Sequence, residues 1–174
     1  MYAANETGAV WSVDTLFEAG PGELLFGKEP SAEQLARAFT GYRAKYVQRL
    51  CADIDAAADA ARQSVVGDPL RAAEYERTAT EAATFRDAGF PDDAVPRAVA
   101  AWAIGDRSAK EAAEDILREA DRFHEALYAI RAQRLAAKEE VRQLVDQERI
   151  DNAHAVAHTT VKHFGLTFTA AVDL

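Results

Sequence analysis

The sequence has a single cysteine, Cys51, and few glycines and prolines. One cysteine excludes an intramolecular disulfide and any zinc cluster built from cysteines. No apolar run approaches the roughly 18 residues of a membrane-spanning helix, and no signal-peptide pattern is present. Basic residues number 20 against 29 acidic ones, which gives a formal net charge of −9. Because no basic stripe is available to meet phosphates, nucleic acid and anionic membranes are not expected as partners.

The common motifs of enzymes are also absent from the sequence. It contains no glycine-rich phosphate loop, no H-E-x-x-H, no G-x-S-x-G and no C-x-x-C. Cys51 lies between Leu50 and Ile54 on a predicted helix, which favours a buried inert thiol over a nucleophile. The many carboxylates follow helix faces that water should solvate. We therefore expect no enzymatic activity, no catalytic residues and no cofactor.

What is present indicates a helical protein. The chain has 174 residues, of which 49% are hydrophobic and 28% charged, enough to bury a core. Alanine, the best helix former, supplies about a fifth of the residues. We expect a mainly α fold, an antiparallel helical hairpin or bundle with a long C-terminal helix. Residues 1–30 are expected to form an extended docking arm, 31–150 the helical bundle, and 151–174 a polar helix end and a short terminal β-strand for contact between subunits.

Local signals place the helices within the bundle. Ser31 is a good N-cap and starts a helix that should run to Gly67. Asp68 and Pro69 then begin a second helix, and so short a turn favours an antiparallel hairpin. Ser108 starts the last and longest helix, whose apolar seam continues to about residue 145. A short helix carrying Trp102, which we expect to pack in the core, lies before it.

Both ends of the chain carry apolar residues that a bundle does not readily cover. The candidate interaction residues of the first 30 positions are Trp11, Leu16, Phe17, Leu24, Leu25 and Phe26. Their density favours docking over a disordered N-terminus. At the other end, Leu166 and Phe168 belong to an alternating stretch that ends at Leu174 and predicts a half-buried strand. Such a strand needs a partner: the N-terminal arm, another copy or another protein.

Asp151, His154 and His158 fall on one side of a continuing helix, and such residues can hold a divalent metal. Three ligands from one helix do not close a structural site, so binding would require a symmetric partner chain. The other interpretation is a polar, fraying helix end in which the histidines meet water. We assign no metal ligands.

The middle of the chain resembles a known family. The residues that carry the resemblance are the run from Ile54-Asp55 to Ala61-Arg62, then Glu74-Tyr75, Glu81-Ala82, Phe85, Gly89, Pro91, Val95-Pro96, Val99, Trp102-Ala103, Ile130-Arg131 and Ala137-Lys138. In this order they resemble the alanine-rich helical domain of small tail or tail-fibre-locus proteins of tailed bacteriophages. The resemblance covers residues 47 to 145 and implies no catalytic residues.

The resemblance implies a non-enzymatic structural component of a phage virion, as a tail, baseplate or fibre-attachment protein. Its partners would be other tail or fibre subunits in a homo- or hetero-oligomer, and it would lie in the host cytoplasm during assembly and afterwards in the virion tail. The alternatives are an assembly factor or chaperone for tail fibres that is absent from finished particles, a helical adaptor unrelated to phage, and an enzyme. The tail substructure, the copy number and any contact with a host receptor stay open.

Overall fold

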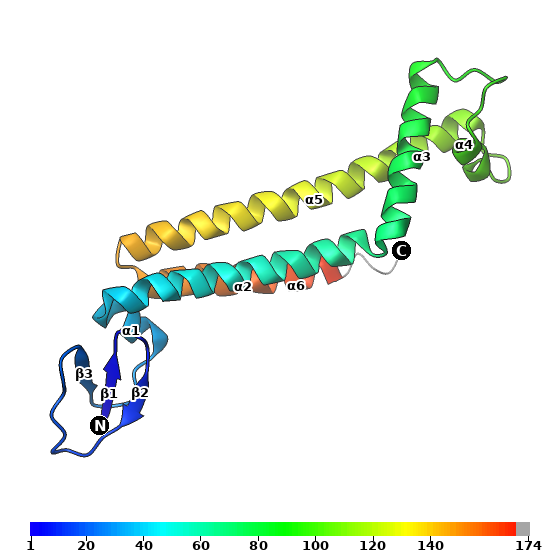
Figure 1. The fold of residues 1–174 in the computed structure, drawn as a ribbon. Coiled ribbons are helices and arrows are strands. Elements are labelled where there is room, and N and C mark those ends of the chain that lie inside the picture. Colours follow the sequence, from blue (N-terminus) through cyan, green and yellow to red (C-terminus); the bar gives the residue numbers. More distant parts are fainter. Residues whose placement is uncertain (170–174) are drawn as a thin grey trace. The chain divides into compact units, whose positions relative to one another are not determined.

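A computed structural model describes residues 1–169 of the chain, with side chains described for residues 1–167. Within this range the protein is mainly helical, as predicted, with one small sheet (Figure 1). In chain order the elements are β1 (Tyr2–Asn5), β2 (Val10–Ser12), β3 (Glu23–Phe26), α1 (Ala32–Ala38), α2 (Thr40–Val66), α3 (Pro69–Asp87), α4 (Arg97–Trp102), α5 (Ala109–Asp146) and α6 (Ile150–Thr169). None of these helices combines the length and apolar character needed to cross a bilayer.

The chain divides into two compact units. Unit 1 comprises Met1–Ala60 and Ala132–Thr167, and unit 2 comprises Ala61–Arg131. Helices α2 and α5 each contribute residues to both units.

The first 26 residues of unit 1 form an antiparallel sheet with the strand order β2–β1–β3. The central strand β1 pairs Ala3 with Trp11 of β2 and with Leu25 of β3. The expectation of an extended arm is therefore wrong, because this segment folds on itself and packs against α1. The two edge strands, β2 and β3, are formed by apolar clusters that can be recognised in the sequence. The strand between them is centred on Ala3 and Ala4, which have low strand propensity and show no alternation.

Helix α1 begins at the predicted N-cap and ends early. Ser31 Oγ accepts the Gln34 N–H at 3.3 Å, and Gln34 Oε1 accepts the Ser31 N–H at 2.9 Å, which is a complete capping box. The long helix expected from Ser31 is interrupted at Phe39, whose backbone is extended (φ −127°, ψ 115°). Phe39 is buried beside Leu35 and the sheet. Packing against the sheet therefore overrides the local helical preference at this position.

Ion pairs fix the relative direction of α2 and α5 within unit 1. Asp55 of α2 accepts from Lys138 Nζ at 2.5 Å and from Arg134 Nη1 at 3.3 Å. Nearer the start of α2, Arg43 Nη1 lies 3.5 Å from Glu148 Oε1, just beyond the end of α5. Residue numbers rise along α2 as they fall along α5, so these two helices run antiparallel (Figure 1).

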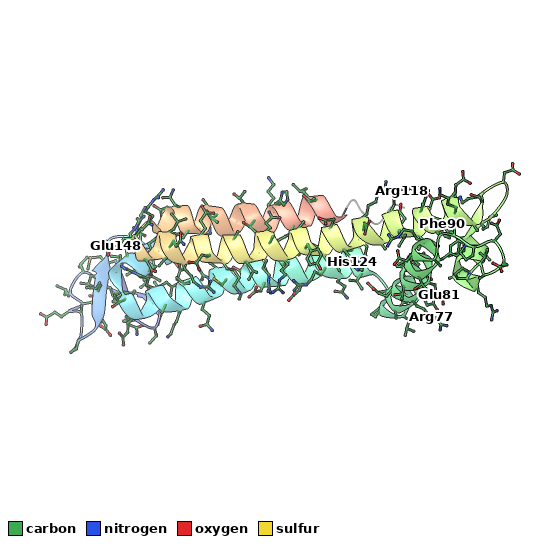
Figure 2. The ribbon with its side chains drawn as sticks, turned by 90° about the horizontal axis from the view of Figure 1, so that it is seen from above. Arg77, Glu81, Phe90, Arg118, His124 and Glu148 are labelled. Atoms are coloured by element: carbon green, nitrogen blue, oxygen red, sulfur yellow. The ribbon has the colours of Figure 1, made fainter. Side chains whose placement is uncertain are left out.

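The chain reverses direction between α5 and α6 at Glu148 (Figure 2). Glu148 has φ +61°, in the left-handed region where glycine is the usual residue. The N–H groups of Glu148 and Arg149 donate to the carbonyls of Val145 (3.0 Å) and Leu144 (2.8 Å). These two bonds form a Schellman motif that ends α5. No glycine or proline marks this turn, and so the sequence did not indicate a separate last helix.

Helix α6 replaces the predicted terminal strand over part of its length. Residues Leu166 to Thr169 belong to α6, so the strand is wrong there, and residues 170–174 lie outside the described residues. The buried face of α6 is made by Ile150, Ala153, Ala157, Thr160 and Phe164. Their spacing of three and four is helical, and this longer pattern outweighs the short alternation that follows it.

Unit 2 has a core of its own. The buried residues are Ala82 and Phe85 of α3, Val99 of α4, and Ala112 and Ala113 of α5. Phe85 also meets Phe90 edge to face, with ring centroids 5.4 Å apart. Trp102, which was expected in the core, is 48% exposed, so that prediction is wrong. The larger side chains packed against this core are Phe90, Val95, Ile116 and Leu117 instead.

Candidate interaction surface

The register of the N-terminal sheet divides its side chains between two faces. Ala4 and Val10 pair across β1 and β2, and together with Phe26 they pack on Leu35 and Phe39. This is the inner face, which holds the sheet against α1. Since side chains alternate along a strand, the neighbouring row points the opposite way.

The outer face carries the row Trp11, Ala3 and Leu25, in that order across the sheet. Ala3 has no exposed area, although it lies in the same row as Trp11 and Leu25. Leu25 is 40% exposed and Trp11 is half-buried. The outer face is thus an apolar row on a sheet whose other side is fixed.

The turn between β1 and β2 anchors the sheet to α2 as well. Asn5 Oδ1 accepts hydrogen bonds from the backbone N–H groups of Thr7 (3.1 Å) and Ala9 (3.3 Å). Gly8 has φ +88°, and a Cβ added there would clash with the ring of Tyr42. Only glycine satisfies both the left-handed backbone and the contact with Tyr42. The sheet is therefore attached to unit 1 at its inner face and at this turn.

The loop between β2 and β3 carries the most exposed of the large apolar side chains. Leu16 is 88% exposed, in a turn where its N–H donates to Asp14 Oδ1 at 2.8 Å. Phe17, next to it, is half-buried. An isolated exposed leucine needs no explanation, but this one extends a segment that already presents Leu25 and Trp11.

The structure separates the predicted interaction residues into distinct groups. Trp11 and Leu25 share the outer face of the sheet, and Leu16 lies in the adjoining loop. Phe26 packs inward on α1, and Leu24 is 44% exposed on an edge strand. We call Trp11, Leu16 and Leu25 the N-terminal apolar surface.

The C-terminal candidates do not join this surface. Asp151, near the start of α6, pairs with Arg37 of α1, next to the sheet. Leu166 is 68% exposed and lies on the same helix, about 22 Å further along at the usual rise per residue. The side chain of Phe168 lies outside the described residues. The two ends of the chain therefore offer separate surfaces within unit 1.

The three residues weighed as metal ligands do lie together on α6, but they do not converge. The rings of His154 and His158 are 6.3 Å apart and nearly parallel, with an interplanar angle of 21°. Asp151 instead engages Arg37. Among the side chains that the structure describes, no three histidine, cysteine or acidic groups are gathered as a metal ion requires. A site shared between symmetric copies stays a hypothesis.

A polar network joins α1, α2 and α6 beside these histidines. The buried Tyr46 hydroxyl donates to Glu33 Oε1 at 3.2 Å, and His154 Nδ1 lies 3.9 Å from the same oxygen. The Ser31 hydroxyl, followed by the Glu33 backbone N–H and Tyr46, lowers the pKa of Glu33 against the opposing effect of its burial. Burial, then the charge of Glu33, raises the pKa of Tyr46. Tyr46 therefore stays neutral and acts as a donor that joins α2 to α1.

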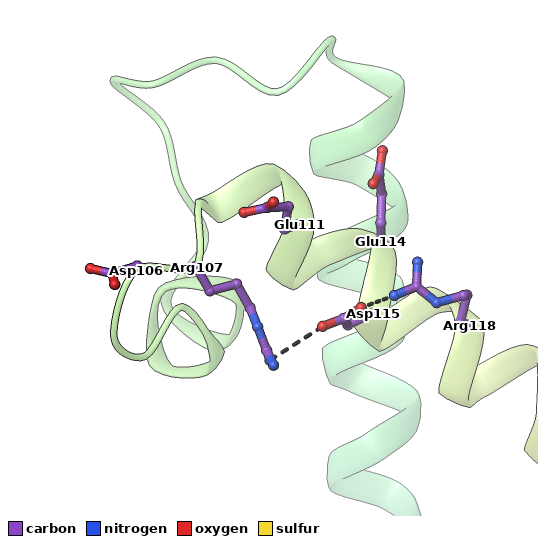
Figure 3. Close-up of a pocket in the computed structure, with 6 residues that line it drawn as sticks. All are labelled: Asp106, Arg107, Glu111, Glu114, Asp115 and Arg118. Atoms are coloured by element: carbon purple, nitrogen blue, oxygen red, sulfur yellow. Dashed lines mark ion pairs between the residues drawn. The ribbon is translucent and has the colours of Figure 1, made fainter.

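A pocket at the start of α5 in unit 2 is lined entirely by charged residues (Figure 3): Asp106, Arg107, Glu111, Glu114, Asp115 and Arg118. Asp115 forms ion pairs with both Arg107 (3.3 Å) and Arg118. Glu111 completes the predicted capping box, accepting the Ser108 N–H at 2.9 Å, and this bond lowers its pKa. Glu111 thus caps a helix, and Asp115 and Glu114 pair with neighbouring cations.

Cys51 is buried, and desolvation raises the pKa of its thiol, with weaker opposing effects from Arg142 and Lys138. A thiol with a raised pKa is a poor nucleophile at neutral pH. Among the described groups, those with shifted pKa values thus belong to a helix cap (Glu111), to the buried packing around Cys51, or to the polar network of Glu33 and Tyr46.

Comparison with known proteins adds no relative: no family model, curated protein or solved structure matches this chain.

Proposed function

We propose that this chain is a non-enzymatic structural component of a phage virion tail, as a tail, baseplate or fibre-attachment protein. It binds neighbouring subunits through the N-terminal apolar surface. The observation that carries the proposal is the way in which this surface is held on unit 1. Leu25 is 40% exposed on the outer face of the sheet, and Leu16 is 88% exposed in the adjoining loop, while the inner face and the first turn of the sheet are packed on α1 and α2. A pre-organised apolar surface loses little conformational entropy on binding.

The phage assignment rests on the sequence resemblance of residues 47 to 145 to tail and tail-fibre-locus proteins. The short turn at Asp68 and Pro69, and not the resemblance, underlies the finer arrangement that we propose, in which α2 and α3 pack as an antiparallel hairpin within a helical bundle. The partners are other tail or fibre subunits in a homo- or hetero-oligomer. The chain lies in the host cytoplasm during assembly and in the virion tail afterwards.

The experiment replaces the gene in the phage or prophage that encodes it with variants of the surface. Leu25→Lys and Leu16→Lys place a charge in the proposed interface without touching the inner face. Leu70→Lys, at a 77% exposed position on α3 of unit 2, is the matched control. We expect each variant to accumulate as a folded protein in lysates, and the first two to be depleted about tenfold or more from purified particles.

Two results would contradict the proposal. Incorporation of all three variants at the level of the unmodified chain would exclude the N-terminal apolar surface as the docking site. Absence of the unmodified chain from particles, together with its abundance in lysates, would replace the structural component by the assembly factor.

A further inference from the structure

A groove of about 490 Å³ lies between α2 and α5 in unit 1. Its α2 wall includes Val47, Cys51, Ala52 and Asp55, and its α5 wall is formed by Lys138 and Arg142. None of these residues belongs to the N-terminal apolar surface. The packing of α2, α5 and α6 leaves this groove open in the described structure.

The α2 wall is mostly apolar. Ala44 and Ala52 are exposed and add almost no side-chain height, the exposed Gln48 lies one turn from each of them, and Cys51 is 7% exposed. Small residues let a second helix approach closely, since the distance between helix axes depends on the side chains at the contact. The lining spans Ala44 to Asp55, about 16 Å of helix, which matches three turns of a partner.

The α5 wall is cationic. Lys138 and Arg142 are one helical turn apart, so they face the same side of α5. Asp55 neutralises part of this charge by pairing with Lys138 and Arg134, and Arg142 lies 3.6 Å from the exposed Glu139 on its own helix. The groove lining itself holds two cations and one carboxylate, in a chain whose formal charge is −9.

This charge pattern decides between occupants. A second copy that presented the same groove would bring Lys138 and Arg142 against their equivalents, and like charges in an interface cost affinity. A basic helix is disfavoured for the same reason. A helix with carboxylates beside an apolar stripe complements both walls at once.

We propose that this groove binds an amphipathic helix of another protein, with small apolar side chains against α2 and two carboxylates four residues apart against Lys138 and Arg142. The inference goes beyond the proposed function, because the surface is distinct from the N-terminal sheet. It also holds whether or not the chain is part of a particle.

The test uses the full chain and a yeast-displayed library of 15-residue helices. Every member has the same alanine stripe, and the flanking positions vary among Glu, Lys, Gln and Ser. We expect sorting to enrich glutamate pairs at i and i+4. Binding of the enriched peptides should weaken as salt rises, because the contacts are partly exposed charges.

Two groove variants, one control variant and the labelling of Cys51 show whether the peptide binds in the groove. Arg142→Glu reverses a charge outside the Asp55 pairs, and Ala52→Phe fills the groove from an exposed position. Each should weaken peptide binding about tenfold or more. Arg122→Glu, an exposed charge reversal on the part of α5 in unit 2, should leave binding unchanged. Because Cys51 is the single cysteine, bound peptide should also slow its labelling by a small maleimide.

Circular dichroism melting shows which variants are folded. If Ala52→Phe does not fold, Arg142→Glu alone tests whether the peptide binds in the groove. The proposal is overturned if no helix is enriched, or if lysine pairs are enriched instead. It is also overturned if the enriched peptides bind the folded Arg142→Glu protein as tightly as the unmodified chain, or leave the Cys51 labelling rate unchanged.

Discussion

Replacing Phe39 by alanine tests whether the N-terminal sheet is a packed part of unit 1. Phe39 is 8% exposed and lies with Leu35 against the inner face of the sheet. Truncating a buried phenylalanine to alanine costs about 3–5 kcal/mol, from lost transfer free energy and from the cavity left behind. The lost contacts join the sheet to α1, so unfolding of the sheet should shift by this amount.

Tryptophan fluorescence can follow the sheet alone. The chain has two tryptophans, Trp11 on the sheet and Trp102 on α4. In a Trp102→Phe background, the half-buried Trp11 reports on the sheet during urea titration. For a small domain, a loss of 3–5 kcal/mol lowers the urea midpoint by about 2 M. Leu25→Ala, on the outer face, is the matched control and should cost less than about 1 kcal/mol.

A shift below about 1 kcal/mol for Phe39→Ala would refute the reasoning, because the inner face would then contribute nothing to the sheet. So would Trp11 emission in the unperturbed protein that already equals the emission in urea. Either result would restore the extended arm that the sequence predicts.

Three further predictions concern the polar network around Glu33, the core of unit 2 and the turn between β1 and β2. Because the pKa of Glu33 is lowered in the folded protein, the unfolded chain binds more protons as the pH falls. The stabilising contribution of Glu33 is therefore complete above about pH 5 and is lost as the pH falls through the folded-state pKa. Glu33→Gln should make the urea midpoint depend less on pH between about pH 5 and 3, and an unchanged dependence would contradict this. Phe85→Ala should cost about 3–5 kcal/mol and speed hydrogen exchange in α3 and α4; equal acceleration in α6 would argue against a separate core in unit 2. Gly8→Ala should lower the melting temperature more than Gly22→Ala, since both have positive φ but only the first would clash, with Tyr42; equal losses would show that this contact is unimportant.

The starts of α1, α3 and α5 were predictable because their signals are local. The capping boxes at Ser31 and Ser108 and the Asp68–Pro69 start each depend on a side chain and a backbone N–H within a few residues. The ends were harder to predict. Phe39 breaks a helix to reach a sheet that is far from obvious in the sequence, and Glu148 takes a backbone conformation that usually marks itself with glycine.

The candidate surface was predictable in composition but not in orientation. Trp11, Leu25 and Phe26 are all apolar, and only the pairing with β1 shows that the first two face outward and the third inward. A shift of register by one residue would exchange these faces. The groove beside Lys138 and Arg142 was missed for a similar reason: it depends on which side of α2 meets α5.

The most direct test of the central claim is quantitative mass spectrometry of density-gradient-purified phage particles from cells that carry this gene. The account predicts a fixed number of copies per particle, a small multiple of three or six. Absence from particles, with abundant chain in the same lysate, would contradict it.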